Sequence, residues 1–306
     1  MVASGTSERS KFLIIITGPT AVGKTSVAIE VAKHFNTEII SADSRQFYKG
    51  MVIGTAAPAI EDLELVKHYF VGHLEIENYF NVAKYEHDVL QILDQLFIKH
   101  RVVVLTGGSG FYIHAVTNGI DELPDADDQI RAHVQEIYNE GGLTELRRML
   151  LKYDPVYAEK VDMANPVRIM RALEVSLQMG VPYSSLLINS KPKRPFNILK
   201  IALNIPRNEL HNRINSRVDA MINSGLEEEV RSFYPKRNFN SLNTVGYREL
   251  FDYFDGLSTK EEAIEKIKTN TRRYARRQIT WIKRDKEYHW FVPDSKVIIS
   301  YIESQL

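Results

Sequence analysis

The stretch GPTAVGKT, from Gly18 to Thr25, has a glycine, four further residues and then Gly-Lys-Thr, which is the pattern of a phosphate-binding loop. The apolar run FLIII at residues 12–16 precedes it and predicts a buried strand. Residues 25–34 follow it with apolar side chains at helical spacing. A strand, a glycine-containing loop and a helix start are the context that this pattern requires, so we expect the chain to bind a di- or triphosphate.

Each part of the loop has a physical role in binding an anion. Gly18 and Gly23 permit tight turns that bring backbone amides together, and the helix start adds unpaired N–H groups and its dipole. Lys24 supplies a mobile positive charge, and the Thr25 hydroxyl can bind Mg²⁺. We therefore expect a diphosphate to be bound by Gly18, Pro19, Thr20, Ala21, Val22, Gly23, Lys24 and Thr25, with Thr25 as the metal ligand.

The composition excludes several classes of protein. The 306 residues include 39 basic and 39 acidic side chains, and the absence of cysteine excludes disulfides, thiolate catalysis and cysteine-ligated zinc. The apolar runs are too short to span a bilayer, and the first ten residues are polar, without an apolar signal core. We expect a cytoplasmic protein without a membrane segment, whose residues 1–10 form a flexible tail.

The order of patterns predicts an α/β fold, a phosphate-loop NTPase-like core with a parallel sheet flanked by helices. Further strands are expected at residues 38–42, 102–106, 198–203 and 289–292, with a helix at 85–100 between two of them. From 119 to 193 strand signals vanish, and helical periodicity appears at 130–139, 143–153 and 166–179. We interpret 119–193 as an all-helical insertion into a core formed by 11–118 and 194–306.

Two polar or glycine-rich segments follow strands of this sheet, where ligand sites of parallel sheets lie. In Asp43-Ser44-Arg45-Gln46, the carboxylate is a candidate general base, a Mg²⁺ ligand or the cap of the next turn. The third strand ends at Thr106 without the acidic residue of many phosphate-loop hydrolases, which disfavours that class. The following segment, 107–110 (GGSG), indicates either backbone packed close to a bulky ligand or a turn without function.

Basic residues cluster at three places in the sequence, where they could bind phosphate groups. Arg213 and Arg217 share one helix face and are either a clamp on phosphate oxygens or a solvated pair; Arg168 and Arg171 pose the same alternatives. In residues 266–286, four apolar or aromatic side chains are expected to form a core stripe: Ile267, Tyr274, Trp281 and Ile282. The same segment contains one acidic residue and nine basic residues: Lys266, Lys268, Arg272, Arg273, Arg276, Arg277, Lys283, Arg284 and Lys286. This charge predicts contact with a nucleic-acid backbone.

Taken in order, seven segments resemble the tRNA dimethylallyltransferases (tRNA isopentenyl transferases), over about residues 11–292. The segments are GPTAVGKT (18–25), SADSRQFYKGMVIGTA (41–56), GGSGFYIHA (107–115), NPVRIMRALEV (165–175), RINSRVDAMINSGLEEEV (213–230), NTVGYREL (243–250) and TRRYARRQITWIKR (271–284). Because no cysteine-based zinc finger follows the basic stretch, the chain resembles the bacterial type.

The resemblance implies a transferase that uses Mg²⁺ and a flipped-out base. The donor would be dimethylallyl diphosphate, and the acceptor the exocyclic N6 amine of the adenosine immediately 3′ of the anticodon, in tRNAs that read codons beginning with U. The amine is otherwise stacked in the loop, so base flipping is expected. The insertion would bind the anticodon stem-loop of the tRNA, and nothing demands more than a monomer.

The resemblance also implies roles for individual residues. Asp43 is similar to the general base that deprotonates the amine, Lys24 and Thr25 to the groups that hold diphosphate and Mg²⁺, and Arg217 to the arginine that stabilises the leaving diphosphate. The expected tRNA-binding residues are Asp43, Ser44, Arg45, Gln46, Ser109, Val167, Arg168 and Arg171, joined by Arg272, Arg276 and Arg277 of the basic stretch.

Three other functions compete with this interpretation. An adenylate isopentenyltransferase, acting on free AMP, ADP or ATP, would share the phosphate loop and the base but would not need the insertion or the basic stretch. A small-molecule kinase is disfavoured by the strand that lacks a terminal acid. A nonenzymatic RNA-binding protein is disfavoured by the intact Lys24, Thr25 and Asp43.

Overall fold

The computed structural model describes residues 10–121, 123–125, 127–188 and 191–306. They form two compact units: Met1–Thr117 together with Lys193–Leu306, called the core unit here, and Asn118–Pro192, called the insertion unit. The insertion unit begins and ends one residue before the segment 119–193 expected from the sequence. The predicted tail at 1–10 lies outside the described residues, apart from Ser10.

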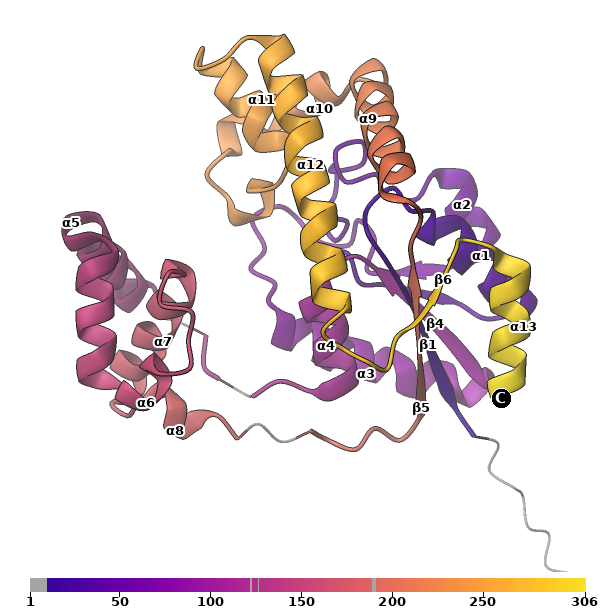
Figure 1. The fold of residues 1–306 in the computed structure, drawn as a ribbon, viewed down its shortest axis with the longest axis horizontal. Coiled ribbons are helices and arrows are strands. Elements are labelled where there is room, and N and C mark those ends of the chain that lie inside the picture. The colour runs from indigo at the N-terminus through magenta and orange to yellow at the C-terminus, as the bar shows by residue number, and fades with distance from the viewer. Residues whose placement is uncertain (1–9, 122, 126, 189–190) are drawn as a thin grey trace, which may run out of the picture. The chain divides into compact units, whose positions relative to one another are not determined.

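The core unit contains a six-stranded, all-parallel sheet in the order β3-β2-β4-β1-β5-β6 (Figure 1). The strands are β1 (Phe12–Thr17), β2 (Ile39–Ser41), β3 (His68–Tyr69), β4 (Val102–Gly107), β5 (Asn197–Leu203) and β6 (His289–Phe291). This confirms the predicted α/β class and five of the strands. The two-residue β3 is too short to produce a periodic signal in the sequence.

Side chains of the strands alternate between two hydrophobic clusters, one on each face of the sheet. Leu13 and Ile15 point toward α3 (Val82–Lys99) and α4 (Gly110–Asn118), whereas Ile14 and Ile16 point toward α1 (Lys24–His34) and α13 (Ser295–Gln305). Both faces of β1 are therefore buried, which explains its uninterrupted apolar sequence.

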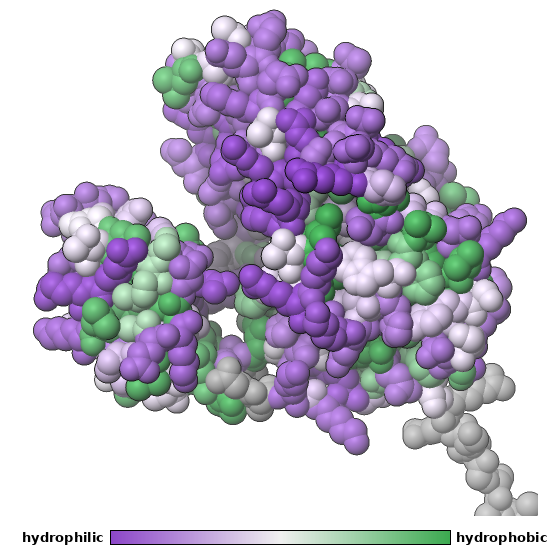
Figure 2. Space-filling view, in the orientation of Figure 1, coloured by the Kyte–Doolittle hydropathy of each residue, from purple (hydrophilic) through white to green (hydrophobic). Residues whose placement is uncertain are grey.

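The remaining helices of the core unit lie beyond the carboxyl ends of the strands. They are α2 (Ile60–Leu65), α9 (Arg207–Asn223), α10 (Leu226–Phe233), α11 (Tyr247–Phe254) and α12 (Lys260–Ile282), with short 3-10 turns at Tyr234–Lys236 and Asn240–Leu242. Hydrophilic side chains cover the visible face of α12 (Figure 2). Among the described residues, no helix combines the length and the apolar character that a membrane span needs.

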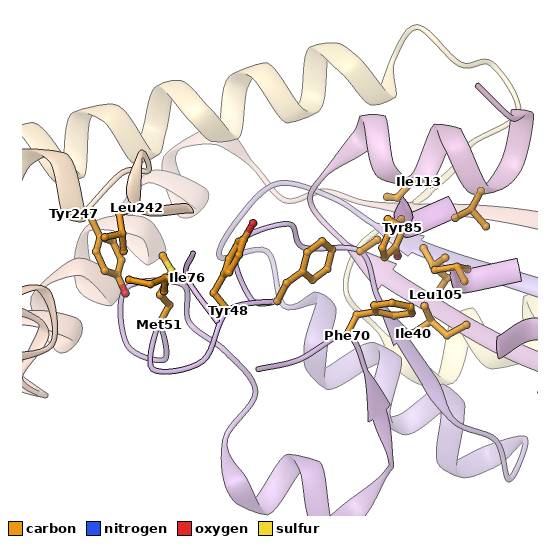
Figure 3. Close-up of a cluster of buried hydrophobic side chains, with 14 of the residues drawn as sticks. Ile40, Tyr48, Met51, Phe70, Ile76, Tyr85, Leu105, Ile113, Leu242 and Tyr247 are labelled. Carbon is orange, nitrogen blue, oxygen red and sulfur yellow. The ribbon is translucent and has the colours of Figure 1, made fainter. Parts of the chain in front are cut away.

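One hydrophobic cluster joins the sheet to these helices. It runs from Ile40 and Leu105 of the sheet through Tyr85 and Tyr48 to Tyr247 of α11, as the labelled side chains in Figure 3 show. The buried Tyr85 hydroxyl also donates a hydrogen bond to the Ser41 carbonyl at the end of β2, with an O···O distance of 2.8 Å. The segment that follows β2 and the facing helices thus share one packed core, which holds them in place relative to each other.

The insertion unit is entirely helical where the structure describes it, with α5 (Asp128–Tyr153), α6 (Pro155–Ala158), α7 (Pro166–Met179) and α8 (Tyr183–Leu186). The two helices predicted at 130–139 and 143–153 are both present within α5, separated by non-helical backbone at Gly142 (φ 61°). Buried Asp154 ties two elements together: its carboxylate accepts hydrogen bonds from the Tyr157 amide in the first turn of α6 and from the Ser184 amide and hydroxyl in α8.

Truncating Leu173 to alanine should destabilise the insertion unit by about 2–5 kcal/mol, because a cavity remains where the side chain was fully buried. Val167→Ala is the matched control, since Val167 lies on the same helix and is 67% exposed; we expect a change below about 0.5 kcal/mol. Hydrogen exchange of the α5 and α7 amides measures both. Equal effects of the two substitutions would contradict a separate core in this unit.

Candidate active site

The predicted phosphate loop connects β1 to α1 and adopts an unusual backbone. Gly18, Ala21 and Gly23 have positive φ angles of 156°, 65° and 105°, and Gly23 caps the first turn of α1. A left-handed conformation at a residue with a side chain, as at Ala21, is concentrated at functional sites. The Lys24 ammonium folds back over the loop and donates to the carbonyls of Gly18 and Pro19 at 3.1 and 2.9 Å.

Lys24, Asp43 and Arg217 are electrostatically coupled. Removal of the Lys24 ammonium from water lowers its pKa to about 8, with Asp43 opposing and Arg217 reinforcing the shift. Burial also lowers the pKa of Arg217, and Asp43 opposes that shift as well. Burial disfavours the charged forms of Lys24 and Arg217, and the single carboxylate of Asp43 only partly offsets this. A bound ligand with several negative charges would stabilise both cations.

Asp43 lies directly beyond β2 and holds the turn that follows it. Its Oδ1 accepts a hydrogen bond from the Arg45 amide at 3.1 Å, and its carbonyl accepts one from the Gln46 amide. The turn-capping role considered from the sequence is therefore present. It does not exclude a catalytic one, because a carboxylate has two oxygens and Asp43 also lines the same cavity as Lys24 and Arg217.

This cavity, of about 110 Å³, lies between the phosphate loop, α9 and α12. Its polar lining includes Thr20, Lys24, Asp43, Arg45, Arg217, Thr271, Tyr274 and Gln278, and its apolar lining includes Ile214, Val218, Met221, Leu226, Val245 and Ile267. A ligand held there can place a charged group beside the phosphate loop and an apolar group against the helices.

Sequence reasoning missed Gln278 and the ligand-facing role of Tyr274, both on α12. Gln278 Oε1 accepts a hydrogen bond from the Thr20 amide of the phosphate loop at 2.8 Å, and its Nε2 donates to the Gly108 carbonyl at 2.9 Å. Tyr274, expected in a core stripe, is only partly buried and lines the cavity; of the same stripe, Ile282 is buried in the core, and Ile267 is buried and also lines the cavity. A helical period of seven residues places Tyr274 on the face of Ile267 and Trp281, but it does not distinguish a core from a cavity wall.

The glycine-rich segment after β4 packs against the protein itself, which gives these glycines a structural role besides the bulky ligand and the functionless turn considered from the sequence. A Cβ at Gly108 would lie 2.2 Å from Gln278 Nε2, and one at Gly110 would lie 2.2 Å from the Trp281 ring. Side chains at these two positions would push α12 away from the sheet. The close approach that requires glycine is thus made by α12, and it brings Gln278 to the phosphate loop.

Glu229 of α10 was also missed, and it holds one wall of the cavity. Its carboxylate accepts hydrogen bonds from three successive amides, Val52, Ile53 and Gly54, at 2.7–3.0 Å, and from the Tyr247 hydroxyl at 2.6 Å. Burial and this adjacent carboxylate raise the pKa of Tyr247, which keeps the hydroxyl protonated as a donor. Gly54, which lines the cavity, is fixed by this contact.

The predicted RNA-contacting residues of the core unit make many contacts within the protein. The Arg45 guanidinium donates to the carbonyls of Asn240, Ser241 and Asn243, and the Gln46 amide group donates to the carbonyls of Thr55 and Ala56. The Ser109 hydroxyl accepts a hydrogen bond from the Ser44 amide at 3.0 Å. These side chains join the loops around the cavity, whether or not they also contact RNA.

Most of the basic stretch lies on α12, which ends at Ile282, so that Lys283, Arg284 and Lys286 follow the helix. Arg276 and Arg277 are exposed, with the Arg277 guanidinium 5.7 Å from the centre of the Tyr274 ring, while Arg272 donates to Asn215 of α9 and to Thr269. Within the part of the chain that the structure describes, none of these three arginines forms an ion pair with a carboxylate. The positive charge of this face is therefore not neutralised by neighbouring acids.

The other predicted RNA-binding residues lie in the insertion unit, in the first two turns of α7. Val167 and Arg168 are exposed, as a binding role requires, and the Arg168 amide is capped by the Asn165 side chain. Arg171 is partly buried, donating to the Pro124 carbonyl at 2.7 Å with Glu174 at 3.8 Å. Of these three, Arg171 has the most evident structural role.

Known proteins are similar to this chain along nearly its whole length. The sequence model of the IPP transferase family matches residues 46–285. The tRNA dimethylallyltransferase of Christiangramia forsetii is 48% identical over 97% of this chain and 99% of its own. Bacteroides fragilis tRNA dimethylallyltransferase 1 is 49% identical over the same shares.

Solved structures agree in fold. The full-length tRNA isopentenylpyrophosphate transferase of Bacillus halodurans aligns with a TM-score of 0.71 at 35% identity, covering 96% of this chain and 95% of its own. A eukaryotic dimethylallyltransferase, described as acting on tRNA, aligns with a TM-score of 0.73 at 25% identity, covering 89% of this chain and 70% of its own.

Proposed function

The chain belongs to the tRNA dimethylallyltransferase family, and we propose that it transfers the dimethylallyl group of dimethylallyl diphosphate to the N6 amine of the adenosine 3′ of the anticodon, in tRNAs that read codons beginning with U. One observation carries this proposal. Lys24 of the phosphate loop, Asp43 and Arg217 line a cavity that also has an apolar part, formed by Ile214, Val218, Met221, Leu226, Val245 and Ile267. A donor with a charged diphosphate and a short hydrocarbon chain matches both parts of this lining.

The chemistry is a substitution at the allylic carbon. The N6 lone pair forms a bond to C1 of the dimethylallyl group, the bond from C1 to the diphosphate oxygen breaks, and the diphosphate leaves with the electron pair. The amine proton passes to the Asp43 carboxylate as general base. Negative charge develops on the leaving oxygen, and we assign its stabilisation to Lys24, Arg217 and the loop amides, which line the same cavity.

We propose that Mg²⁺ is held by the Thr25 hydroxyl together with diphosphate oxygens. Thr25 lies in the first turn of α1, directly after Lys24, and hydroxyl oxygen is a hard ligand that suits this cation. The described residues contain no cluster of three or more acidic or histidine side chains that could hold a metal alone. Mg²⁺ is usually bound by few protein groups and by substrate phosphates, and its charge would assist departure of the diphosphate.

The features that an adenylate acceptor would not need support tRNA as the acceptor. They are Arg276 and Arg277 of α12, which form no ion pair with any residue that the structure describes, and the insertion unit with its exposed Val167 and Arg168. We propose that both units contact the anticodon stem-loop, with Ser44 and Ser109 near the flipped base. A tRNA substrate implies a cytoplasmic location, and a monomer suffices because one chain supplies every residue named.

An acceptor competition tests the proposal. Labelled dimethylallyl diphosphate and Mg²⁺ are incubated with an unmodified anticodon stem-loop that contains three consecutive adenosines, in the presence of excess AMP. Label in the RNA alone is the expected result. Label in AMP alone would assign the chain to the adenylate isopentenyltransferase reaction, and label in neither would reject dimethylallyl diphosphate as the donor.

Replacing Arg276 and Arg277 by alanine should flatten the dependence of tRNA affinity on salt. Each phosphate contact releases bound counterions, so losing two contacts should lower the slope of log affinity against log salt by about 1 per contact. The matched control replaces Lys33 and Arg231, which are exposed but paired with carboxylates at 3.1 and 2.8 Å. If both double variants had the same slope of log tRNA affinity against log salt, Arg276 and Arg277 would not contact the RNA backbone.

A further inference from the structure

We propose that Phe111, supported by Trp281, is a stacking platform for an unpaired base of the anticodon loop, next to the adenosine that is flipped out. The inference rests on the proposed function, because it assumes that an RNA loop binds with one base turned out of its stack. It adds an aromatic residue of α4 to the RNA-binding surface, which so far consists of polar and basic side chains in the core unit.

The Phe111 ring is exposed and is also paired with a second ring. It is the second residue of α4, directly beyond β4, and its side chain is 51% exposed. A single exposed apolar residue is common on protein surfaces and needs no explanation. Here, however, the ring centres of Phe111 and Trp281 lie 6.4 Å apart with their planes at 78°, an edge-to-face arrangement. This contact leaves about half of the Phe111 side chain open to another planar group.

The pair is held in place by close packing of α4 on α12. Figure 1 shows α4 beside the C-terminal end of α12. Gly110 directly precedes Phe111, and a Cβ at Gly110 would lie 2.2 Å from the indole ring of Trp281, so the first turn of α4 rests on that ring. Trp281 is partly buried and lies in the last turn of α12. A ring that is already fixed loses little conformational freedom when it binds a base.

Both arms of the platform begin at residues that surround the cavity. Gln278, which lines the cavity, lies three residues before Trp281, about 4.5 Å along the axis of α12. Ser109, two residues before Phe111, accepts a hydrogen bond from the amide of Ser44, which directly follows the candidate general base. If the flipped base enters the cavity, the next nucleotide of the loop is therefore within reach of Phe111.

The charge around the two rings favours a nucleic acid over an apolar protein partner. Arg277 and Arg284, four residues before and three residues after Trp281, are both exposed. Asp285, the acidic residue of this segment, is paired with buried Lys200 at 2.7 Å. Aromatic rings among basic side chains are typical of surfaces that bind single-stranded nucleic acid, where rings stack on bases and cations contact phosphates. Bases of RNA loops are available for such stacking, whereas paired bases are not.

Base flipping creates the surface that this ring would cover. Each base of the loop stacks on its neighbours, and moving one of them into the active site costs unstacking energy. A flanking base then exposes one face to water. Stacking of that face on Phe111 would offset part of the cost and would favour the flipped state.

The test measures binding of two stem-loops in the absence of donor. In each, 2-aminopurine, whose fluorescence is quenched by stacking, replaces one of the two adenosines that flank the target. Phe111→Ala should increase the fluorescence of one bound stem-loop relative to the wild-type complex. It should also weaken binding about 5- to 150-fold, the range expected for loss of one base–aromatic stack. Because no charge is removed, the slope of log affinity against log salt should stay the same.

Three further variants serve as controls. Phe111→Tyr keeps the ring and should match wild type, whereas Phe111→Leu keeps an apolar side chain without a ring and should resemble Phe111→Ala. Trp290→Ala should have no effect, because Trp290 is also an exposed aromatic residue of the core unit, at 38%, but lies on the edge strand β6, separated from β4 by β1 and β5.

The inference is overturned if Phe111→Ala keeps the wild-type affinity and fluorescence, or if Phe111→Leu keeps both, since the contact would then be apolar packing without stacking. A reduced salt slope in Phe111→Ala would overturn it as well, because the substitution would then act by displacing the arginines of α12. Stacking needs no donor, so binding of the stem-loop without transfer would reject the proposed function alone. Failure of the wild type to bind the stem-loop would reject both.

Discussion

Asp43→Asn should lower kcat for dimethylallyl transfer by about 10²–10⁴-fold, the contribution typical of a general base, while tRNA binding changes little. Asparagine retains the side-chain oxygen that accepts the Arg45 amide hydrogen, so the turn after β2 stays in place. What is lost is the ability to take the proton from the N6 amine. Single-turnover kinetics with saturating donor and stem-loop measures this directly.

The choice of pH matters for that experiment, because Asp43 also acts on Lys24. The carboxylate raises the pKa of the Lys24 ammonium, which burial lowers to about 8, so removing its charge lowers that pKa further. Measurement at about pH 7, with donor affinity determined separately, distinguishes loss of the base from loss of the Lys24 charge. Turnover within tenfold of wild type at saturating donor would reject Asp43 as the base.

Local patterns predicted the fold well, because they depend on neighbours in the sequence. The buried strand β1, the loop of Gly18–Lys24 and helix α1 form one continuous segment, and α7 has the predicted bounds of 166–179. The short β3 was missed, since its hydrogen bonds to β2 come from residues that have no distinctive pattern of their own. Pairing of that kind is set by tertiary context.

The site was predictable only in part, for a related reason. The residues of the phosphate loop can be identified from their spacing in the sequence. In contrast, Gln278 is 258 residues from its partner Thr20, and Glu229 is 175–177 residues from the amides it binds. A glutamine on a basic helix and a glutamate in an acidic run carry no local signal of such contacts. The glycines at 108 and 110 were an available clue: they indicated a close approach, although the partner is α12 rather than a ligand.

Arg217→Ala should lower kcat by about 10²–10³-fold, the loss typical when one group that stabilises developing negative charge is removed. Arg217 lines the cavity on α9, and burial lowers its pKa, so its interaction with a leaving diphosphate is only weakly screened by water. The charge on the leaving oxygen grows as the bond from C1 breaks. Because the donor is already anionic in the ground state, donor affinity should fall too, but by less than kcat.

Arg213→Ala is the control that the helix itself provides. Arg213 lies one turn before Arg217, yet its side chain is 44% exposed and pairs with Glu209 at 2.7 Å, and it is absent from the cavity lining. We expect its loss to lower kcat by less than about tenfold, since its guanidinium is exposed to solvent and already bound by Glu209 and the Val22 carbonyl, so its charge is well screened from the diphosphate. Equal losses for the two variants would favour a clamp in which both arginines close on the diphosphate. A large loss for Arg217→Ala alone, not restored in Arg217→Lys, would show that the planar guanidinium, with its paired N–H donors, is what the leaving group requires.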